Sequence, residues 1–246
     1  MAKYILFDTE TTGASEEDRV IQIGMMIVHS KTNIEVFDEL CSTTVPIKLE
    51  AMEVHNIIPS MLEGKRSFIQ TDSYENLLKY NENENYLIAH NINFDLGMLQ
   101  KEGFKNQYTL IDTLRCAKHL YNEMPYHRLQ YLRYALELYT IEEKEANDLG
   151  IVIKAHDAIG DVLVMKLFLS KLVQKAMEIY PKENPMVKLA ELTKTPVLIK
   201  TFKFGKYKGA EVAEVAKKDA GYLMWMRDNM ADLDEDMRYT LESYLG

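Results

Sequence analysis

The first part of the chain consists of short apolar runs separated by polar turns. Residues 4–7 are an unbroken apolar run, which is typical of a buried strand. Residues 19–28 and 33–41 predict two further strands joined by a polar turn, so the first three strands form a meander. Two later runs, residues 86–89 and 108–111, predict strands that are each followed by helices. The pattern therefore predicts an α/β fold with a mixed five-stranded sheet flanked by helices.

Helical spacing and capping residues mark the segments between and after these strands. Residues 94–103 have apolar positions at helical spacing, and Asp112 is placed to cap the helix after the fifth strand. Apolar positions from Ala158 onward predict a long helix that lies on the sheet and ends before Pro181. The charged run at residues 142–145 is expected to be solvated.

The end of the chain differs in composition and predicts a second, smaller domain. Residues 181–199 contain three prolines and show no lasting periodicity, so we expect a linker there. It would join a first domain at residues 1–180 to a small α+β domain at residues 200–246.

The start of this small domain alternates aromatic and basic residues around two glycines. Lys203, Lys206 and Lys208 could form a surface that contacts nucleic acid. Residues 200–246 carry eight Lys or Arg and nine Asp or Glu, so a packing or partner-binding module is the alternative.

Two carboxylates follow the first apolar run. Side chains in a strand alternate between faces, so Asp8 and Glu10 point to the same side. Like charges held that close repel, and a cation between them offsets the repulsion. Carboxylate oxygens are ligands that Mg²⁺ and Mn²⁺ prefer. Taken alone, the two residues also fit an acidic, solvated turn.

Two later motifs supply further carboxylates and histidines. Residues 90–95 read His-Asn-Ile-Asn-Phe-Asp, and residues 156–161 read His-Asp-Ala-Ile-Gly-Asp at the start of the long apolar helix. Together with Asp-Thr-Glu-Thr-Thr-Gly at residues 8–13, they resemble the three exonuclease motifs of the DnaQ-like, or DEDDh, family of 3′→5′ exonucleases. The segment from about residue 200 resembles the small C-terminal domain of exodeoxyribonuclease X-type proteins.

The resemblance implies a ribonuclease H-like fold and a metal-dependent 3′→5′ exonuclease that releases nucleoside 5′-monophosphates. Two divalent ions about 4 Å apart can perform such phosphodiester hydrolysis. The resemblance assigns two Mg²⁺ (or Mn²⁺) to the carboxylates of the motifs, which are Asp8, Glu10, Asp95 and Asp161. We expect His156 to lie on the loop just before the helix that carries Asp161. It is expected to be the general base, because neutral imidazole accepts a proton near pH 7. Asp157 is expected to be exposed or capping, and not a metal ligand.

The same resemblance assigns another set of residues to the terminal nucleotide of the substrate: Thr11, Thr12, His55, His90, Asn91 and Phe94. The family carries His-Gly-Ile near the substrate where this chain has His55-Asn56-Ile57, so Asn56 departs from the pattern. A structural role is the alternative for His55. For Phe94, a place in the core is an equal alternative to a surface on which a base stacks.

Composition restricts the remaining possibilities. The net charge of −9 excludes binding of nucleic acid by bulk charge, so contact has to occur at a local site where metal ions supply the positive charge. Cys41 and Cys116 are far apart and in no metal-ligand spacing, which predicts free thiols and a cytoplasmic protein. No apolar stretch reaches the roughly 20 residues of a membrane span.

The motifs alone are compatible with more than one function. Proofreading subunits, DNA repair exonucleases and RNA-trimming enzymes of the family use the same five residues. The C-terminal resemblance favours DNA, with a single-stranded 3′ end as substrate and a polymerase or repair protein as partner. An exoribonuclease and a non-catalytic nucleic-acid-binding module are the alternatives.

Overall fold

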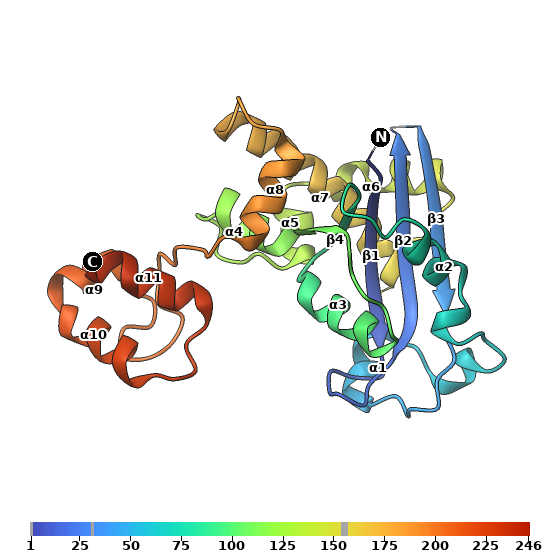
Figure 1. Cartoon of the computed structure of the whole chain (residues 1–246), viewed down its shortest axis with the longest axis horizontal. Coiled ribbons are helices and arrows are strands. Elements are labelled where there is room, and N and C mark those ends of the chain that lie inside the picture. Colours follow the sequence, from blue (N-terminus) through green and yellow to red (C-terminus); the bar gives the residue numbers. More distant parts are fainter. Residues whose placement is uncertain (1, 31, 154–156) are drawn as a thin grey trace. The chain divides into compact units, whose positions relative to one another are not determined.

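The chain divides into two compact units. A computed structural model describes residues 2–30, 32–153 and 157–246. Unit 1 comprises Met1–Thr193 and unit 2 comprises Lys194–Gly246 (Figure 1).

Unit 1 is built on a mixed sheet with the strand order β3-β2-β1-β4-β5. Within the described residues the five strands are β1 Tyr4–Thr11, β2 Val20–Ser30, β3 Asn33–Leu40, β4 Tyr86–Ala89 and β5 Thr109–Asp112. The first three strands pair antiparallel, whereas β4 pairs parallel with both β1 and β5. The predicted meander and mixed five-stranded sheet are therefore confirmed.

Helices fill the connections of unit 1. They are α1 Leu49–His55, α2 Asp72–Lys79, α3 Ile92–Lys101, α4 Thr113–Leu120, α5 Leu129–Ala135, α6 Tyr139–Leu149, α7 Ala158–Ile179 and α8 Pro185–Lys194. Two short 3₁₀ turns, η1 Pro59–Leu62 and η2 Phe68–Gln70, lie between α1 and α2. In the described part of the chain, no helix combines the length and the apolar character that crossing a membrane requires.

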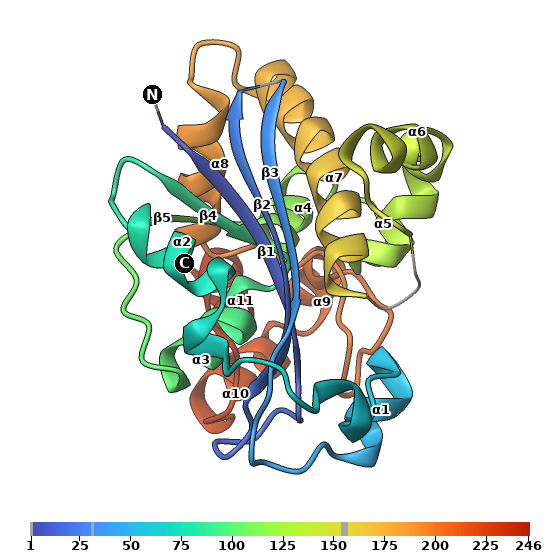
Figure 2. The same cartoon turned by 90° about the vertical axis from the view of Figure 1, so that its right-hand side faces the viewer.

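The alternation of side chains along the strands gives unit 1 a core on each face of the sheet. Leu6, Met26 and Ile88 lie in the core that is shared with α4 to α8. Their neighbours Ile5 and Phe7 face the opposite core, which α2 and α3 cover. Figure 2 shows α5 and α6 next to α7 on one side of the strands. Because even-numbered residues of β1 face α7, Asp8 and Glu10 point toward that helix.

A glycine allows the start of α7 to approach the sheet closely. Gly24 of β2 is paired with Asp8 of β1. A Cβ atom added to Gly24 would lie 2.4 Å from the backbone of Ala158 and Ile159, at the first turn of α7. Real Cβ atoms do not come this close to backbone atoms. The missing side chain thus determines where this turn, which carries Asp161, sits against the strands.

Unit 2 is a three-helix unit with its own core. In this part of the described chain the helices are α9 Val212–Lys218, α10 Ala220–Asn229 and α11 Glu235–Leu245. Phe202 packs with Val212, Leu223 and Leu241 at the centre. The β part of the predicted α+β domain is a single isolated β-bridge between Thr201 and Glu211.

The predicted linker is wrong over much of its length. Residues 185–194 form α8, and its buried residues Leu189, Ala190 and Leu192 belong to the core of unit 1. Pro185 is the first residue of this helix, a position that Pro favours because its missing N–H has no partner there in any case. Pro185 was therefore a signal of a helix start and not of a linker.

We predict that Gly24→Ala destabilises the protein by about 1–3 kcal/mol, because the new methyl group forces the first turn of α7 away from β2. Gly97→Ala in α3 is the matched control, since a Cβ there meets nothing within 4 Å. The control should stabilise by about 0.5–1 kcal/mol. Urea unfolding measures both free energies, and equal stability of the Gly24 variant and the wild type would contradict the proposed role of Gly24.

Candidate active site

Four carboxylates from three separate segments of the sequence meet at the end of β1. Asp8 and Glu10 lie on the strand itself and are half-buried. Asp95 is the fourth residue of α3 and is buried, whereas Asp161 is the fourth residue of α7 and is half-buried. A carboxylate in the first turn of a helix is stabilised by the unpaired N–H groups there. The structure thus places together the four residues that the motifs predicted.

Thr9 fixes the orientation of Asp95. Its backbone N–H and its hydroxyl both donate to Oδ1 of Asp95, at 3.1 and 2.7 Å. Thr9 alternates with Asp8 and Glu10 along β1, so its side chain faces the opposite side of the strand, toward α3. One strand therefore supplies two carboxylates and positions a third.

Burial and neighbouring charge raise the pKa values of three of the four groups. Burial, together with the negative charges of Asp95, Asp161 and Glu10, holds the pKa of Asp8 well above its usual range. Burial and the charges of Asp161 and Asp95 raise the pKa of Glu10 to about 8. Burial raises the pKa of Asp95 to about 7, although the two hydrogen bonds from Thr9 act in the other direction. The protein therefore concentrates negative charge here.

The donor set fits a hard divalent cation. Carboxylate oxygens are the ligands of Mg²⁺ and Mn²⁺, and a cation would offset the repulsion that raises these pKa values. Within the described residues, no three acidic, His or Cys side chains already surround one point as ligands. The fit therefore rests on the chemistry and the proximity of the carboxylate oxygens.

Asp157 stands directly before the first turn of α7. His156, the predicted general base, lies outside the described residues. Oδ1 of Asp157 accepts a hydrogen bond of 2.8 Å from Nε2 of Gln22. The same nitrogen of Gln22 also donates to Asp38. Asp157 thus stands at the N-cap position of α7, as predicted, but its side chain is half-buried and bonds to the sheet instead of capping the helix.

A chain of polar contacts leads from Asp161 into the helices beside it. Nε2 of Gln130 on α5 donates to Oδ1 of Asp161 at 2.6 Å. Arg133, one turn further along α5, donates from Nη1 to the side-chain oxygen of Gln130 at 3.4 Å and from Nε to Glu142 at 2.6 Å. Glu142 is only 2 % exposed, so the prediction of a solvated charge run is wrong at this residue.

His90, predicted to meet the substrate, is held within the protein. Its Nδ1 contacts the hydroxyl of Thr113 at 2.9 Å and its Nε2 contacts the carbonyl of His127 at 2.9 Å. Burial lowers the pKa of His90 to about 4, so the ring is neutral near pH 7. With both nitrogens engaged, His90 positions the turn between β4 and α3.

Asn91 and Asp112 have separate roles at the same edge of the sheet. Asn91 adopts a left-handed conformation with φ 74° before α3, and its exposed side chain makes no capping bond. Its backbone N–H donates to Oδ1 of Asp112 at 3.0 Å. The same oxygen accepts from the N–H groups of Leu114 and Arg115, which confirms Asp112 as the predicted helix cap.

His55 joins α1 to the end of β1. Its Nδ1 accepts a hydrogen bond of 3.0 Å from the N–H of Ile57, so Nε2 carries the proton and donates to the carbonyl of Thr11 at 3.2 Å. Asn56 between them has φ 60°, in the left-handed region that Gly favours and Asn tolerates. Asn56 therefore adopts a left-handed turn that suits the Gly of the family pattern, and the side chain of His55 is buried and structural.

The hydroxyls of Thr11 and Thr12 are also used inside the protein. Thr11 donates to the carbonyl of Gly13 at 2.7 Å, and Thr12 donates to Oδ1 of Asp18 at 2.9 Å. A Cβ on Gly13 would lie 2.7 Å from Oδ2 of Asp18, so glycine leaves the space for this buried carboxylate. These threonines shape the loop beside Glu10, and their side chains are not turned to a substrate.

Phe94 is the predicted substrate residue with an accessible ring. It lies in the first turn of α3, directly before Asp95, and is 39 % exposed. A core role is therefore excluded.

The sequence analysis missed three residues that contact the acidic residues of this region. Thr9 could have been found from strand alternation, since it lies between two predicted ligands and must face the other side. Gln22 on β2 is 135 residues from its partner Asp157, and Gln130 on α5 is 31 residues from its partner Asp161. The sequence does not determine which face of these elements points toward the acidic residues.

Two family comparisons match this chain. The Exonuclease family matches residues 5–169, which include all four carboxylates. The family described as Exodeoxyribonuclease X-like C-terminal matches residues 202–230, in unit 2.

Individual proteins agree with these matches. The chain is 25% identical to Exodeoxyribonuclease 10 of Escherichia coli strain K12 over 240 residues, which are 98% of this chain and 97% of that protein. Exonuclease X in complex with 5′ overhanging duplex DNA superposes with a TM-score of 0.53 and 18% identity, over 77% of this chain and 99% of that one. A zinc-bound complex of E. coli exonuclease I with single-stranded DNA gives a TM-score of 0.52 and 18% identity, over 74% of this chain and 42% of that one.

The structural likenesses confirm the ribonuclease H-like architecture that the motifs predicted. The Exonuclease match covers more than half of the chain and contains the carboxylates that converge at the end of β1. The chain therefore belongs to the Exonuclease family.

Proposed function

We propose that this protein is a metal-dependent 3′→5′ exonuclease that degrades DNA to nucleoside 5′-monophosphates. The observation that carries the proposal is the convergence of four carboxylates, three of which have raised pKa values, within a domain of the Exonuclease family. Such a cluster has an electrostatic cost, and binding of cations offsets it.

Asp8, Glu10, Asp95 and Asp161 are the residues that would hold two Mg²⁺ or Mn²⁺ ions. When bound, divalent ions acidify the attacking water and stabilise negative charge on the phosphate and on the leaving oxygen. The protein's own contribution is orientation. Thr9 holds one oxygen of Asp95 and Gln130 holds one oxygen of Asp161, so each carboxylate presents a defined side to the site.

His156 is the proposed general base. Its imidazole would take the proton of the attacking water, which neutral imidazole can do near pH 7. The chain order supports this role, because His156 stands directly before Asp157 and five residues before Asp161.

The terminal nucleotide of the substrate is proposed to lie against the first turn of α3. Phe94 offers an exposed ring on which a base can stack, and the exposed amide of Asn91 offers hydrogen bonds. The other proposed substrate residues, Thr11, Thr12, His55 and His90, act by shaping this surface, because their polar atoms bond within the protein.

The choice of DNA over RNA is supported by the similarity to Exodeoxyribonuclease 10, which extends over almost the whole of both chains. A single-stranded 3′ end is the proposed substrate, and an exoribonuclease is the alternative. The buried free thiols of Cys41 and Cys116 support a cytoplasmic location. A polymerase or repair protein as partner stays a prediction.

The first prediction concerns the reaction. With Mg²⁺ or Mn²⁺, single-stranded DNA labelled at its 5′ end should be shortened to a ladder from the 3′ end, and EDTA should stop the reaction. His156→Ala should lower the rate about 10²- to 10⁴-fold with metal binding intact, whereas Asp8→Ala should reduce both. Asp148→Ala, on the exposed side of α6, is the control.

Three results would contradict this account. Retention of the DNA without shortening would favour a non-catalytic binding module. Faster degradation of RNA than of DNA of matched sequence would favour the exoribonuclease. Loss of metal binding in the His156 variant would show that this residue is a ligand or a structural residue.

The second prediction concerns stability and pH. In EDTA, the free energy of unfolding should fall as the pH rises from about 4.5 to about 8. The folded state holds the protons of Glu10 and Asp95 more tightly than the unfolded chain does, so raising the pH favours unfolding. Saturating Mg²⁺ should reduce the slope, because a bound cation favours ionised carboxylates.

Urea unfolding across this pH range measures the slope, with NaCl of equal ionic strength as the control for screening. Asp8→Asn removes one of the interacting charges and should flatten the slope without metal. An identical slope in this variant and in the wild type would show that the cluster does not cause it.

The third prediction concerns Gln130 as a positioning residue. Gln130→Ala removes the hydrogen bond to Asp161, and loss of such an outer contact typically weakens metal binding about 10- to 100-fold. Titration calorimetry with Mn²⁺ measures this affinity. Gln174→Ala, on the exposed side of α7, is the matched control. Equal affinities of the two variants would exclude the positioning role.

A further inference from the structure

Unit 2 separates its charges along the sequence. Residues 194–218 contain seven lysines and two glutamates, a formal charge of +5. Residues 219–246 contain two arginines and seven acidic residues, a formal charge of −5. Although the unit is neutral as a whole, its first half is a basic segment. Most of this segment is the loop at residues 200–211 and helix α9.

A row of aromatic rings borders this basic loop. Tyr222 and Trp225, one turn apart on α10, stack with centroids 6.1 Å apart and planes 22° apart. Tyr207 of the loop meets Tyr222 edge to face at 5.0 Å, and the buried ring of Phe202 supports Tyr222 from the core. Trp225 at the end of the row is 53 % exposed. The row therefore holds the exposed ring of Trp225 against half-buried tyrosines.

The loop places cationic and aromatic side chains around this row. The Nζ atom of Lys206 lies 4.8 Å from the ring centre of Tyr207 and 5.8 Å from that of Tyr222, and it donates to Asp219 at 3.0 Å. Gly205 has φ 73°, and a Cβ on it would lie 2.5 Å from the hydroxyl oxygen of Tyr222. The turn is thus fixed against the rings.

The side chains on either side of this turn face solvent. Lys203 and Lys208 are exposed, and Phe204 is 40 % exposed. The strand alternation that would have buried Phe204 beside Phe202 is absent, because residues 204–210 form turns.

We propose that this surface, formed by Lys203, Phe204, Lys206, Lys208 and Trp225, binds the single-stranded DNA of the substrate. The inference rests on the proposed exonuclease function. Exposed aromatic rings stack on bases without regard to sequence, and lysines beside them pair with phosphates. The charge of the loop favours this occupant, because residues 200–211 contain four lysines and one glutamate, and this formal charge of +3 complements the phosphates of a DNA strand. Trp225 provides the stacking surface and Lys203 and Lys208 track the backbone, whereas Lys206, which donates to Asp219, holds the turn against the rings.

The chain contains one tryptophan, which makes the test direct. The full-length wild-type protein in EDTA is titrated with an oligothymidylate about 12 nucleotides long, and tryptophan fluorescence is recorded. We expect saturable quenching, with the same midpoint as fluorescence anisotropy of the labelled oligonucleotide. An abasic strand of equal length keeps the phosphates without the bases, so it should bind and leave the fluorescence nearly unchanged. Binding of the oligothymidylate without quenching would overturn the proposal.

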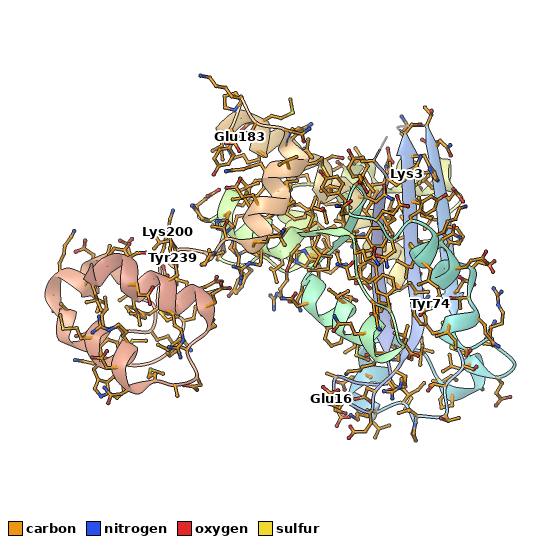
Figure 3. All side chains as sticks on the ribbon, viewed as in Figure 1. Lys3, Glu16, Tyr74, Glu183, Lys200 and Tyr239 are labelled. Atoms are coloured by element: carbon orange, nitrogen blue, oxygen red, sulfur yellow. The ribbon has the colours of Figure 1, made fainter. Side chains whose placement is uncertain are left out.

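A pair of variants separates the surface from the general fold of unit 2. Trp225→Ala should weaken binding measured by anisotropy about tenfold, with the rate at saturating DNA unchanged. Tyr239→Ala on α11, labelled in Figure 3, is the control, because Tyr239 is 41 % exposed outside the row of rings. Equal affinities of the two variants would overturn the proposal, provided that both melt as the wild type does.

The salt dependence of the affinity tests the lysines separately. Replacing Lys203 and Lys208 together by Ala should make the dependence of log affinity on log salt shallower by about two units, one per lost phosphate contact. An unchanged salt slope would assign the surface to a protein partner instead. Failure of the proposed exonuclease function would give a different result. Neither the wild type nor the Trp225→Ala variant would then shorten DNA.

Discussion

The repulsion among four carboxylates at the end of β1 is the constraint on which this structure depends. Each of these groups has neighbours of its own charge, and burial removes much of the water that would screen them. A folded chain keeps such an arrangement only if the surrounding elements hold it rigidly or if a cation binds. The sheet and both first helical turns supply the rigidity. The chemistry of the oxygens makes a divalent cation the natural ligand.

The elements around the cluster can be understood from this constraint. Strand alternation in β1 directs Asp8 and Glu10 to the side of α7 and Thr9 to the side of α3. One strand therefore carries two of the carboxylates and holds a third, Asp95, through Thr9. The missing side chain of Gly24 lets the first turn of α7 lie against β2. On the outer side, Gln130 links Asp161 to Arg133 and so to the buried Glu142. The site is thus supported from the sheet and from the flanking helices.

Much of this could be predicted from the sequence, because its strongest signals are local. The apolar runs predicted the five strands in order, and the three motifs predicted the four carboxylates. The positions that failed depend on contacts between distant segments. Glu142 was expected in solvent, but an arginine on another helix pairs with it. His55, His90 and Thr12 carry groups suited to a substrate, yet only the structure shows that their polar atoms are already bonded. The exposure of Phe94 likewise depends on where α3 begins.

The central claim is that Asp8, Glu10, Asp95 and Asp161 form a divalent-metal site. Anomalous diffraction from crystals soaked in Mn²⁺ tests it most directly, because the signal identifies the ion and its position independently of any activity. The account predicts two manganese peaks about 4 Å apart among these four carboxylates, and loss of peaks at the site in the Asp8→Asn variant. Ordered carboxylates without manganese between them, in crystals that bind the ion elsewhere, would contradict it.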